Sequence, residues 1–329
     1  MHIIIATDAW SPQVNGVVRS YQHLIDELIN EHKITLITPN EFYTFPLPLY
    51  PEIRISVLTS RSIGKRIETL NPDAIHIATE GTIGLATRNY CIKTNRNFTT
   101  AYHTRFPEYL NELIHVPLSV GYAICRWFHS PATNMMVSTE SLAKELEKKG
   151  FNNASIFPKG VNSELFKNYK TKPINYKRPI FLYVGRISKE KNIEAFLDLD
   201  LPGTKLVVGD GPIRKSLQNK FPDVKFLGYK FGADLALAYT NADVFVFPSL
   251  TDTFGIVMLE ALACGTPIAA YPVRGPKEVI GDSEVGVLSR DLKQACLDAM
   301  NIKGDICKKH AKKFSWKKSA ESFLKNLNI

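Results

Sequence analysis

The sequence predicts an α/β protein with two Rossmann-like domains, each built around a parallel sheet. Apolar segments of strand length open the two halves of the chain, at residues 2–7 and 180–185, and a helical pattern follows each of them. Similar pairs of strand and amphipathic helix recur along the rest of the chain, which is the order of repeated β-α-β units. A length of 329 residues is sufficient for two domains of ordinary size.

The composition excludes several classes of protein. An apolar share of 44% is that of a globular protein, and no run approaches the roughly 18 apolar residues that span a bilayer. The chain opens directly with a strand, without a basic region or a cleavage site, so we expect neither secretion nor an integral membrane protein. The cysteines have no disulfide or metal spacing, which favours reduced thiols in a cytosolic protein. They are Cys91, Cys125, Cys264, Cys296 and Cys307.

A formal net charge of +9 indicates an acidic partner. The candidates are nucleic acid, anionic lipid and a phosphorylated ligand. No RNA-binding or DNA-binding motif accompanies the charge, so we expect no nucleic acid.

The first half of the chain opens with a β-α-β unit. A loop follows the strand at residues 2–7, a helix starts at Gly16, and residues 33–38 return as a strand. Asn15 and Gly16 therefore lie at the edge of the sheet where such folds bind ligands, although Asn-Gly is also an ordinary turn. Three further strands continue the sheet, at residues 74–78, 98–102 and 133–137.

Residues 41–51 are rich in aromatic residues and prolines, which predicts an irregular loop. Its apolar side chains either pack under the first domain, which we favour, or form an exposed patch. Such a patch would enter a lipid surface beside Arg61, Lys65 and Arg66.

Two further segments in the first half of the chain are candidates for function. His103 follows the strand at residues 98–102, at the edge of the sheet where such folds hold their chemistry, although a lone histidine is more often structural. Residues 117–129 form a helix with apolar faces and with Arg126 near its end. Core packing is the default explanation for this helix, and a groove for a lipid acceptor is the alternative.

A basic stretch that contains proline, residues 167–179, indicates a linker between domains. We therefore place the first domain at residues 1–165 and the second at residues 166–315. Arg186 and Lys191 follow the first strand of the second sheet, so both cations can reach one pair of phosphates. Charge-assisted hydrogen bonds of this kind are worth roughly 1.5 to 3 kcal/mol each. A surface lysine beside two glutamates is the alternative for Lys191.

Residues 243–271 read as a strand, a turn, a helix and a further strand. Gly255 opens the helix, and the free N–H groups of the next residues suit an anion such as phosphate. Two carboxylates flank this point, Asp252 before the helix and Glu260 inside it. Asp252 is equally explained as a helix cap, worth about 0.3 to 1 kcal/mol. Glu260 stands among apolar residues, where a carboxylate is costly to bury unless something bonds to it, so we expect a ligand contact.

The spacing of this motif, an acid and a glutamate separated by seven residues with Phe254-Gly255 between them, resembles a known family. It is similar to the retaining nucleotide-sugar glycosyltransferases of the GT-B type, in the family of sucrose synthase-like, phosphatidylinositol mannosyltransferase and sulfoquinovosyl diacylglycerol synthase-like enzymes. Their fold has two Rossmann-like domains that face each other across a cleft. Asp252 stands where the family usually has glutamate.

The resemblance implies roles for individual residues in donor binding. Asp252 contacts hydroxyls of the transferred sugar, and Glu260 holds the ribose. The donor diphosphate meets the backbone of Phe254, Gly255 and Ile256, the cations Arg186 and Lys191, and the loop at Gly16. Backbone groups at Gly228 and Tyr229 read the base.

The resemblance also extends to the first domain. The segment A-Y-H-T-R-F-P-E-Y-L is very similar to one in lipid-directed members, which implies that His103 contacts the sugar near the reacting carbon. Asn15, Arg105 and Arg126 are weaker candidates for acceptor binding. A last helix, at about residues 316–329, is expected to pack back on the first domain.

The implied reaction is transfer of a hexose, with retention of configuration, from a UDP-linked or GDP-linked sugar. We expect no cofactor and no metal, because the only Asp-x-Asp motif, Asp198-Leu199-Asp200, ends a helix. The expected acceptor is a lipid such as diacylglycerol on an anionic membrane surface, with the enzyme in the cytoplasm on the inner face of the membrane. The alternatives are a GDP-mannose-dependent α-mannosyltransferase that acts on a phosphoinositide or glycan, a UDP-sugar 2-epimerase, and an inactive binding module.

Overall fold

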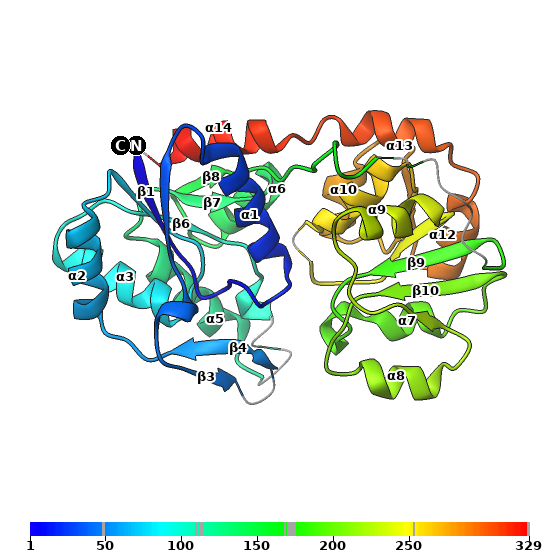
Figure 1. The fold of residues 1–329 in the computed structure, drawn as a ribbon, viewed down its shortest axis with the longest axis horizontal. Helices are drawn as coiled ribbons and strands as arrows, with labels where there is room; N and C mark the ends of the chain where they lie inside the picture. Colours follow the sequence, from blue (N-terminus) through cyan, green and yellow to red (C-terminus); the bar gives the residue numbers. More distant parts are fainter. Residues whose placement is uncertain are drawn as a thin grey trace. The chain divides into compact units, whose positions relative to one another are not determined.

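The structure, a computed structural model, describes residues 1–47, 50–108, 111, 115–167, 169, 176–252 and 254–327, with the backbone alone for residues 50–53. The chain divides into two compact units. The first unit is Met1–Lys159 with Trp316–Ile329, and the second is Gly160–Ser315. Each unit contains a six-stranded parallel sheet with helices on both faces (Figure 1). The predicted α/β fold with two parallel sheets is therefore confirmed.

The sheet of the first unit has the strand order β2-β1-β5-β6-β7-β8, and every neighbouring pair is parallel. The carboxyl ends of all six strands therefore meet at one edge. The strands are β1 (His2–Ala6), β2 (Lys33–Ile37), β5 (Ala74–Ile77), β6 (Thr99–Ala101), β7 (Met135–Val137) and β8 (Ala154–Ile156).

Helices cover both faces of this sheet because successive side chains of a strand point to opposite sides. Ile3 and Ile5 of β1 pack with α1 (Gly16–Leu28) and α14 (Trp316–Asn326). Ile4 packs on the other face. The helices of that face are α2 (Ser60–Leu70), α3 (Thr82–Lys93), α5 (Leu118–His129) and α6 (Glu140–Lys148).

The expectation of an irregular loop at residues 41–51 is wrong. After a short 3-10 turn, η1 (Pro39–Glu41), the strands β3 (Thr44–Leu47) and β4 (Tyr50–Ser56) form an antiparallel ribbon. A ribbon of two strands tolerates proline because each strand has an unpaired side. Tyr43 is 91% exposed and Phe45 49%, so these two side chains do not pack under the first unit as we favoured. Residues 48 and 49 lie outside the described residues.

The sheet of the second unit has the order β11-β10-β9-β12-β13-β14, again with parallel neighbours. Its first strand in the sequence, β9, lies in the middle, and the chain adds strands first on one side and then on the other. The strands are β9 (Ile180–Val184), β10 (Thr204–Val208), β11 (Lys225–Phe226), β12 (Val244–Phe247), β13 (Ile268–Ala270) and β14 (Gly286–Leu288).

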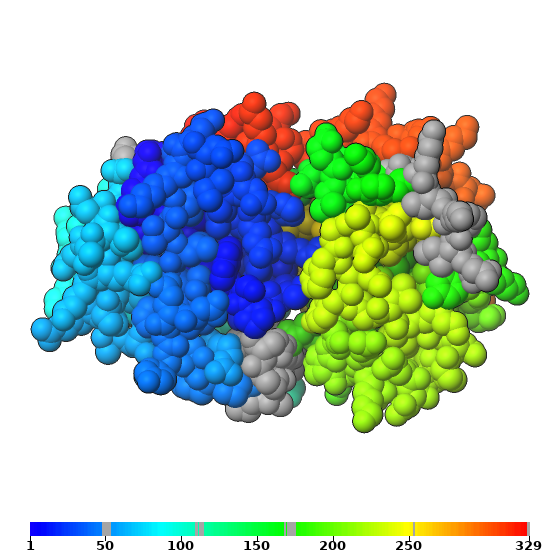
Figure 2. Space-filling view, viewed as in Figure 1, coloured from blue at the N-terminus to red at the C-terminus, as the bar shows by residue number. Residues whose placement is uncertain are grey.

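Two groups of helices cover this second sheet (Figure 1). One face carries α9 (Gly232–Asn241), α10 (Ile256–Cys264), α11 (Arg274–Ile280) and α13 (Gly304–Ala311). The other carries α7 (Ile193–Leu197), α8 (Arg214–Lys220) and α12 (Leu292–Ala299). The outer sides of α2 and α8 are polar and lie at the surface of their units (Figure 2).

The five cysteines are free and buried. Among the helices that the structure describes, none has both the length and the apolar character needed to span a bilayer.

Candidate active site

The centre of the second sheet is where ligands of open parallel sheets bind. The chain order reverses between β9 and β12, and ligands of such folds occupy the crevice at the carboxyl ends of the two strands on either side of the reversal. Arg186 and Lys191 follow β9, and the segment that contains Asp252 and Gly255 follows β12. The fold thus gathers these predicted residues at one point of one unit.

Hydrogen bonds join the two segments directly. Lys191 Nζ donates to Asp252 Oδ1 at 2.5 Å, and Asn192 Nδ2 donates to the carbonyl of Pro248 at 3.1 Å. The side chains of Lys191 and Asp252 remain 29% and 22% exposed. The acids that the alternative interpretation assigned to Lys191 have other partners, because Glu190 accepts from a serine and Glu194 pairs with Lys220.

Helix α10 begins at this junction. Gly255 has a φ of 91°, and a Cβ at this position would come within 2.8 Å of the Met258 side chain and 3.0 Å of the Phe247 ring. Glycine is therefore required by both conformation and space. The N-cap residue Gly255 has no side chain to cap the helix, so among the described residues it leaves the first amides of α10 available to an anion. The Phe254 ring is buried against Phe314, which leaves its backbone to meet a ligand, and Thr253 lies outside the described residues.

Glu260 lies one turn further along α10 and is only 1% exposed. The hydroxyl of Tyr239, on α9, donates to Glu260 Oε2 at 2.8 Å. This bond satisfies part of the carboxylate's capacity within the unit and fixes the side chain. The sequence motif around Glu260 did not indicate Tyr239, because Tyr239 stands on a different helix.

Arg186 and the segment after β11 lie near each other. Burial and the charge of Asp210 raise the pKa of Tyr229, while the charge of Arg186 opposes that shift. Gly228, with a φ of 69°, accepts a hydrogen bond from the Gly209 amide at 2.9 Å. The rings of Tyr229 and Phe231 stack with centroids 5.8 Å apart and are about half exposed, so they offer a flat surface for a base. No sequence pattern indicated Phe231.

In the first unit, Asn15 and Gly16 stand at the start of α1. Asn15 Oδ1 accepts from the amides of Val17 and Val18, both at 3.0 Å, so Asn15 is the helix cap. Gly16 is exposed, and a Cβ there would meet no described atom within 4 Å. The described part of the chain thus gives no steric reason for glycine at position 16.

His103 follows β6 and belongs to a chain of polar side chains. His103 Nε2 lies 3.0 Å from Tyr21 Oη, which lies 2.6 Å from His76 Nε2, and His76 Nδ1 lies 2.8 Å from Thr99 Oγ1. Burial, followed by the positive charge of Lys159, lowers the pKa of His76 to about 3 and that of His103 well below its ordinary value. Both imidazoles are therefore neutral near pH 7. No sequence pattern indicated Tyr21, His76 or Lys159.

The predicted acceptor residues Arg105 and Arg126 are tied to the protein. Arg105 Nη2 donates to both carboxylate oxygens of Glu145, on α6, at 2.6 and 2.9 Å. Arg126 Nη1 donates to the carbonyl of Lys149 at 2.9 Å. Both arginines thus connect segments of the first unit, and their contact with an acceptor stays a prediction.

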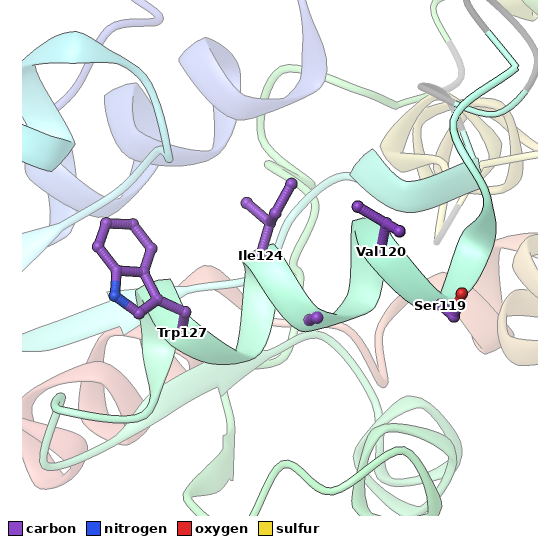
Figure 3. Close-up of a pocket in the computed structure, with 5 residues that line it drawn as sticks. Ser119, Val120, Ile124 and Trp127 are labelled. Atoms are coloured by element: carbon purple, nitrogen blue, oxygen red, sulfur yellow. The ribbon is translucent and has the colours of Figure 1, made fainter.

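Helix α5 has one buried and one exposed apolar side. Tyr122, Cys125 and Phe128 pack inward. On the outer side, Val120, Ile124 and Trp127 project from the helix and line a shallow pocket with Ser119 and Ala123 (Figure 3). Between 43% and 53% of each large apolar side chain on this outer side is exposed. We call Leu118, Val120, Ile124 and Trp127 the outer face of α5.

Two family models match the chain. The model described as Glycosyltransferase Family 4 matches residues 14–165, and the model described as Glycosyl transferases group 1 matches residues 164–299. The two matches follow one another along most of the chain.

Three curated relatives are similar over most of this chain. The sulfoquinovosyl transferase of Arabidopsis thaliana is 28% identical over 83% of the chain, and the match spans 60% of that enzyme. A GDP-mannose-dependent α-mannosyltransferase of Mycobacterium tuberculosis is 25% identical over 88% of the chain and 83% of its own length. The α-monoglucosyldiacylglycerol synthase of Streptococcus pneumoniae is 26% identical over 100% of the chain and 85% of its own length.

Solved structures show the same fold. The sucrose-phosphate synthase of Thermosynechococcus elongatus superposes with a TM-score of 0.80 at 19% identity, covering 99% of this chain and 98% of its own. The HepE protein of Anabaena, solved in complex with UDP and glucose, superposes with a TM-score of 0.74 at 14% identity over 99% of both chains. With two parallel-sheet units and consecutive matches to both family models, the chain belongs to the GT-B glycosyltransferases of family 4.

Proposed function

We propose that the protein is a metal-independent, retaining glycosyltransferase that transfers a hexose from a nucleoside diphosphate sugar to a lipid such as diacylglycerol. The observation that carries this proposal is the junction of Lys191 and Asp252 beside the uncapped start of α10. Cationic and amide donors meet there with a carboxylate suited to sugar hydroxyls. This combination fits a sugar linked to a diphosphate.

In the proposed mechanism, protein groups take the place of a divalent cation. Arg186, Lys191 and the first amides of α10 stabilise the negative charge that develops on the departing diphosphate. When the donor binds, Lys191 exchanges Asp252 for phosphate, and Asp252 binds the sugar. Glu260, held by Tyr239, binds the ribose hydroxyls. No further carboxylate is assigned as a nucleophile, so we propose a front-face displacement in which the leaving phosphate helps to deprotonate the acceptor.

Neutral His103 is assigned to the transferred sugar. Because its pKa is lowered, it acts as a hydrogen-bonding group and not as a cation at neutral pH. The remaining predicted contacts, at Gly16, Gly228 and Tyr229, are assigned to the donor, and Asn15 to the acceptor.

The names of relatives support the choice of substrates. One relative is a glucosyldiacylglycerol synthase, and a structural neighbour was solved with UDP and glucose. We therefore propose a UDP-linked donor and a diacylglycerol-type acceptor. The outer face of α5 supplies an apolar surface for lipid, and the net charge of +9 favours an anionic membrane. Peripheral attachment to the inner face of the membrane follows as part of the proposal.

A second candidate has support from another relative. The similar mannosyltransferase of Mycobacterium tuberculosis depends on GDP-mannose, so a guanosine-linked donor and a phosphoinositide or glycan acceptor are the alternative. The experiment below tests the identity of the donor and that of the acceptor separately.

The test uses purified protein and vesicles that contain diacylglycerol or phosphatidylinositol. UDP-glucose, UDP-galactose, UDP-glucuronate and GDP-mannose are supplied in turn, and the lipid products are identified by mass. We expect one hexose to be added to diacylglycerol from a UDP-linked donor. Conversion of a UDP-sugar without any acceptor would identify an epimerase, and donor binding without turnover would identify an inactive module.

Site variants connect this activity to the proposed residues. Arg186→Ala and Glu260→Ala should each lower kcat/KM by about a hundredfold or more, equivalent to roughly 3 kcal/mol. Lys189→Ala is the matched control, because Lys189 is an exposed cation on the 3-10 turn η2 (Lys189–Lys191). Full activity in both site variants would contradict the assignment.

A further inference from the structure

Lys159 is a buried lysine at the end of the first unit. It follows β8 by three residues, at the same edge of the sheet as His103, and is 6% exposed. Its Nζ lies 4.1 Å from the centroid of the Phe157 ring and has no hydrogen-bond partner among the described residues. An ammonium group has three donors, and burying a charge without a partner is costly. Among the described residues, this ammonium group therefore has no hydrogen-bond acceptor.

The titratable groups around Lys159 do not compensate its charge. Two of them are His103 and His76 on β5, and the charge of Lys159 adds to the effect of burial in lowering the pKa of both histidines. Glu80, whose charge adds to the effect of burial in raising the pKa of Tyr21, pairs with His129 at 3.3 Å. Burial lowers the pKa of Lys159 itself to about 7.

We propose that Lys159 binds a phosphate oxygen of the substrates of sugar transfer. The inference rests on the proposed function and adds Lys159 to the residues assigned to substrate. A phosphate oxygen carries the negative charge that the surroundings of Lys159 lack, and a compact ammonium binds it as a point charge. The His103 ring lies 6.2 Å from the same Phe157 ring that Lys159 covers, so the lysine stands beside the residue assigned to the transferred sugar.

The phosphate has two possible sources, the donor diphosphate and a phosphate on the acceptor lipid. Lys159→Met keeps an unbranched apolar side chain and removes the charge, whereas Lys159→Arg keeps the charge. For the donor source, we expect the affinity for UDP, measured by calorimetry at pH 7, to fall by about tenfold or more in Lys159→Met and by less in Lys159→Arg. Lys149→Met is the matched control, because Lys149 also lies over an aromatic ring, with Nζ 3.7 Å from the Tyr122 centroid.

If the phosphate belongs to the acceptor lipid, we expect the affinity of Lys159→Met for UDP to equal that of the wild type. The KM for phosphatidylinositol in vesicles then rises by about tenfold or more, while the KM for diacylglycerol does not change. Values within twofold of the wild type for UDP and for both lipids would overturn the inference while leaving the proposed function intact. Absence of UDP binding by the wild-type protein would overturn both.

Two further readouts separate binding from a structural role. For the donor source, the affinity of the wild-type protein for UDP should decrease as pH rises from 7.5 to 9, because the amine loses its charge, and Lys159→Met should lack this decrease; for the acceptor source, the same pH dependence should appear in 1/KM for phosphatidylinositol. The Tm of Lys159→Met should equal or exceed that of the wild type, because an unpaired buried charge has been removed. A lower Tm together with unchanged binding would show that Lys159 is structural.

Discussion

Lys191 and Asp252 are bonded to each other although the proposed mechanism assigns them to different parts of the donor. Both are partly exposed, and an exposed ion pair contributes only about 0 to 1 kcal/mol to stability. A bound diphosphate can therefore displace Asp252 from Lys191 at small cost. The pair holds both side chains in position before the donor arrives and prevents the repulsion that an isolated carboxylate would exert on phosphate.

Asp252→Asn separates the two functions of this residue. Because Lys191 no longer pairs with a carboxylate, we expect the affinity for UDP, which lacks the sugar, to stay equal or to rise by up to about fivefold. The rate of sugar transfer should fall, because the contact with the sugar hydroxyls is weakened. Calorimetry with UDP and steady-state kinetics measure the two effects, and a parallel loss of both would contradict the proposed exchange.

The pKa of Lys159 also predicts a pH dependence of stability. In the folded protein the pKa is about 7, below the ordinary value of 10.5, so the unfolded chain binds more protons in this range. The free energy of unfolding should therefore increase with pH above about 7, by up to about 1.4 kcal/mol per pH unit for this group. Denaturant unfolding at pH 7, 8 and 9 should show a shallower increase for Lys159→Met. Identical slopes for the two proteins would contradict the burial of a titrating amine.

At the scale of elements, sequence patterns predicted the local structure of candidate segments that are continuous in the chain. The strand, turn and helix around Gly255 are encoded locally by an apolar run, a glycine and two acids, and α10 begins where the pattern predicts. The ribbon of β3 and β4 was not recognised, because its prolines suggested irregular structure and a two-stranded ribbon has no amphipathic signature of its own. The hydrogen-bonded chain of Tyr21, His76 and His103 also could not be predicted from the sequence. The sheet order alone brings α1, β5 and the segment after β6 together.

Replacing the glycine at the start of α10 or of α1 by alanine should affect stability differently. Gly255→Ala places a Cβ against Met258 and Phe247 at a positive φ, so we expect a loss of stability of about 1 to 3 kcal/mol. Gly16→Ala meets no described atom, so the Tm should not fall, whereas the affinity for the donor should decrease if a ligand approaches there. Thermal unfolding and calorimetry with UDP distinguish the two. Unchanged donor affinity in Gly16→Ala would remove Gly16 from the proposed site.

Helix α5 allows a test of membrane attachment that leaves the donor site unaltered. Ile124→Gln places a polar side chain on the outer face of α5, where 46% of the isoleucine is exposed, so the fold should tolerate it. We expect weaker flotation with anionic vesicles and an unchanged affinity for UDP. Ile92→Gln is the matched control, because Ile92 is likewise 46% exposed but lies on α3. Equal flotation of both variants would exclude the outer face of α5 as the lipid contact.

At the scale of the whole molecule, the α/β class could be predicted because alternating strand and helix patterns run through both halves of the chain. The match to the Arabidopsis sulfoquinovosyl transferase spans 60% of that enzyme, so the likeness concerns the shared two-unit fold and not that protein's full length. The partners of individual candidate residues were not predictable, because Tyr239 bonds to Glu260 from a different helix. Sequence patterns therefore locate the edges of the sheets that carry chemistry, and the structure shows which side chains meet there.

The first unit is discontinuous in sequence, since the second unit is inserted before α14. Phe323 of α14 is fully buried with Tyr21 and Leu24 of α1, so this helix is part of the first unit's core. The segments on either side of the insertion run together, with Val161 N donating to the carbonyl of Phe314 at 3.2 Å. During synthesis on the ribosome, the whole second unit therefore emerges before the helix that closes the core of the first. A nascent chain that stops before α14 would expose the apolar surface around Tyr21 to chaperones and proteases.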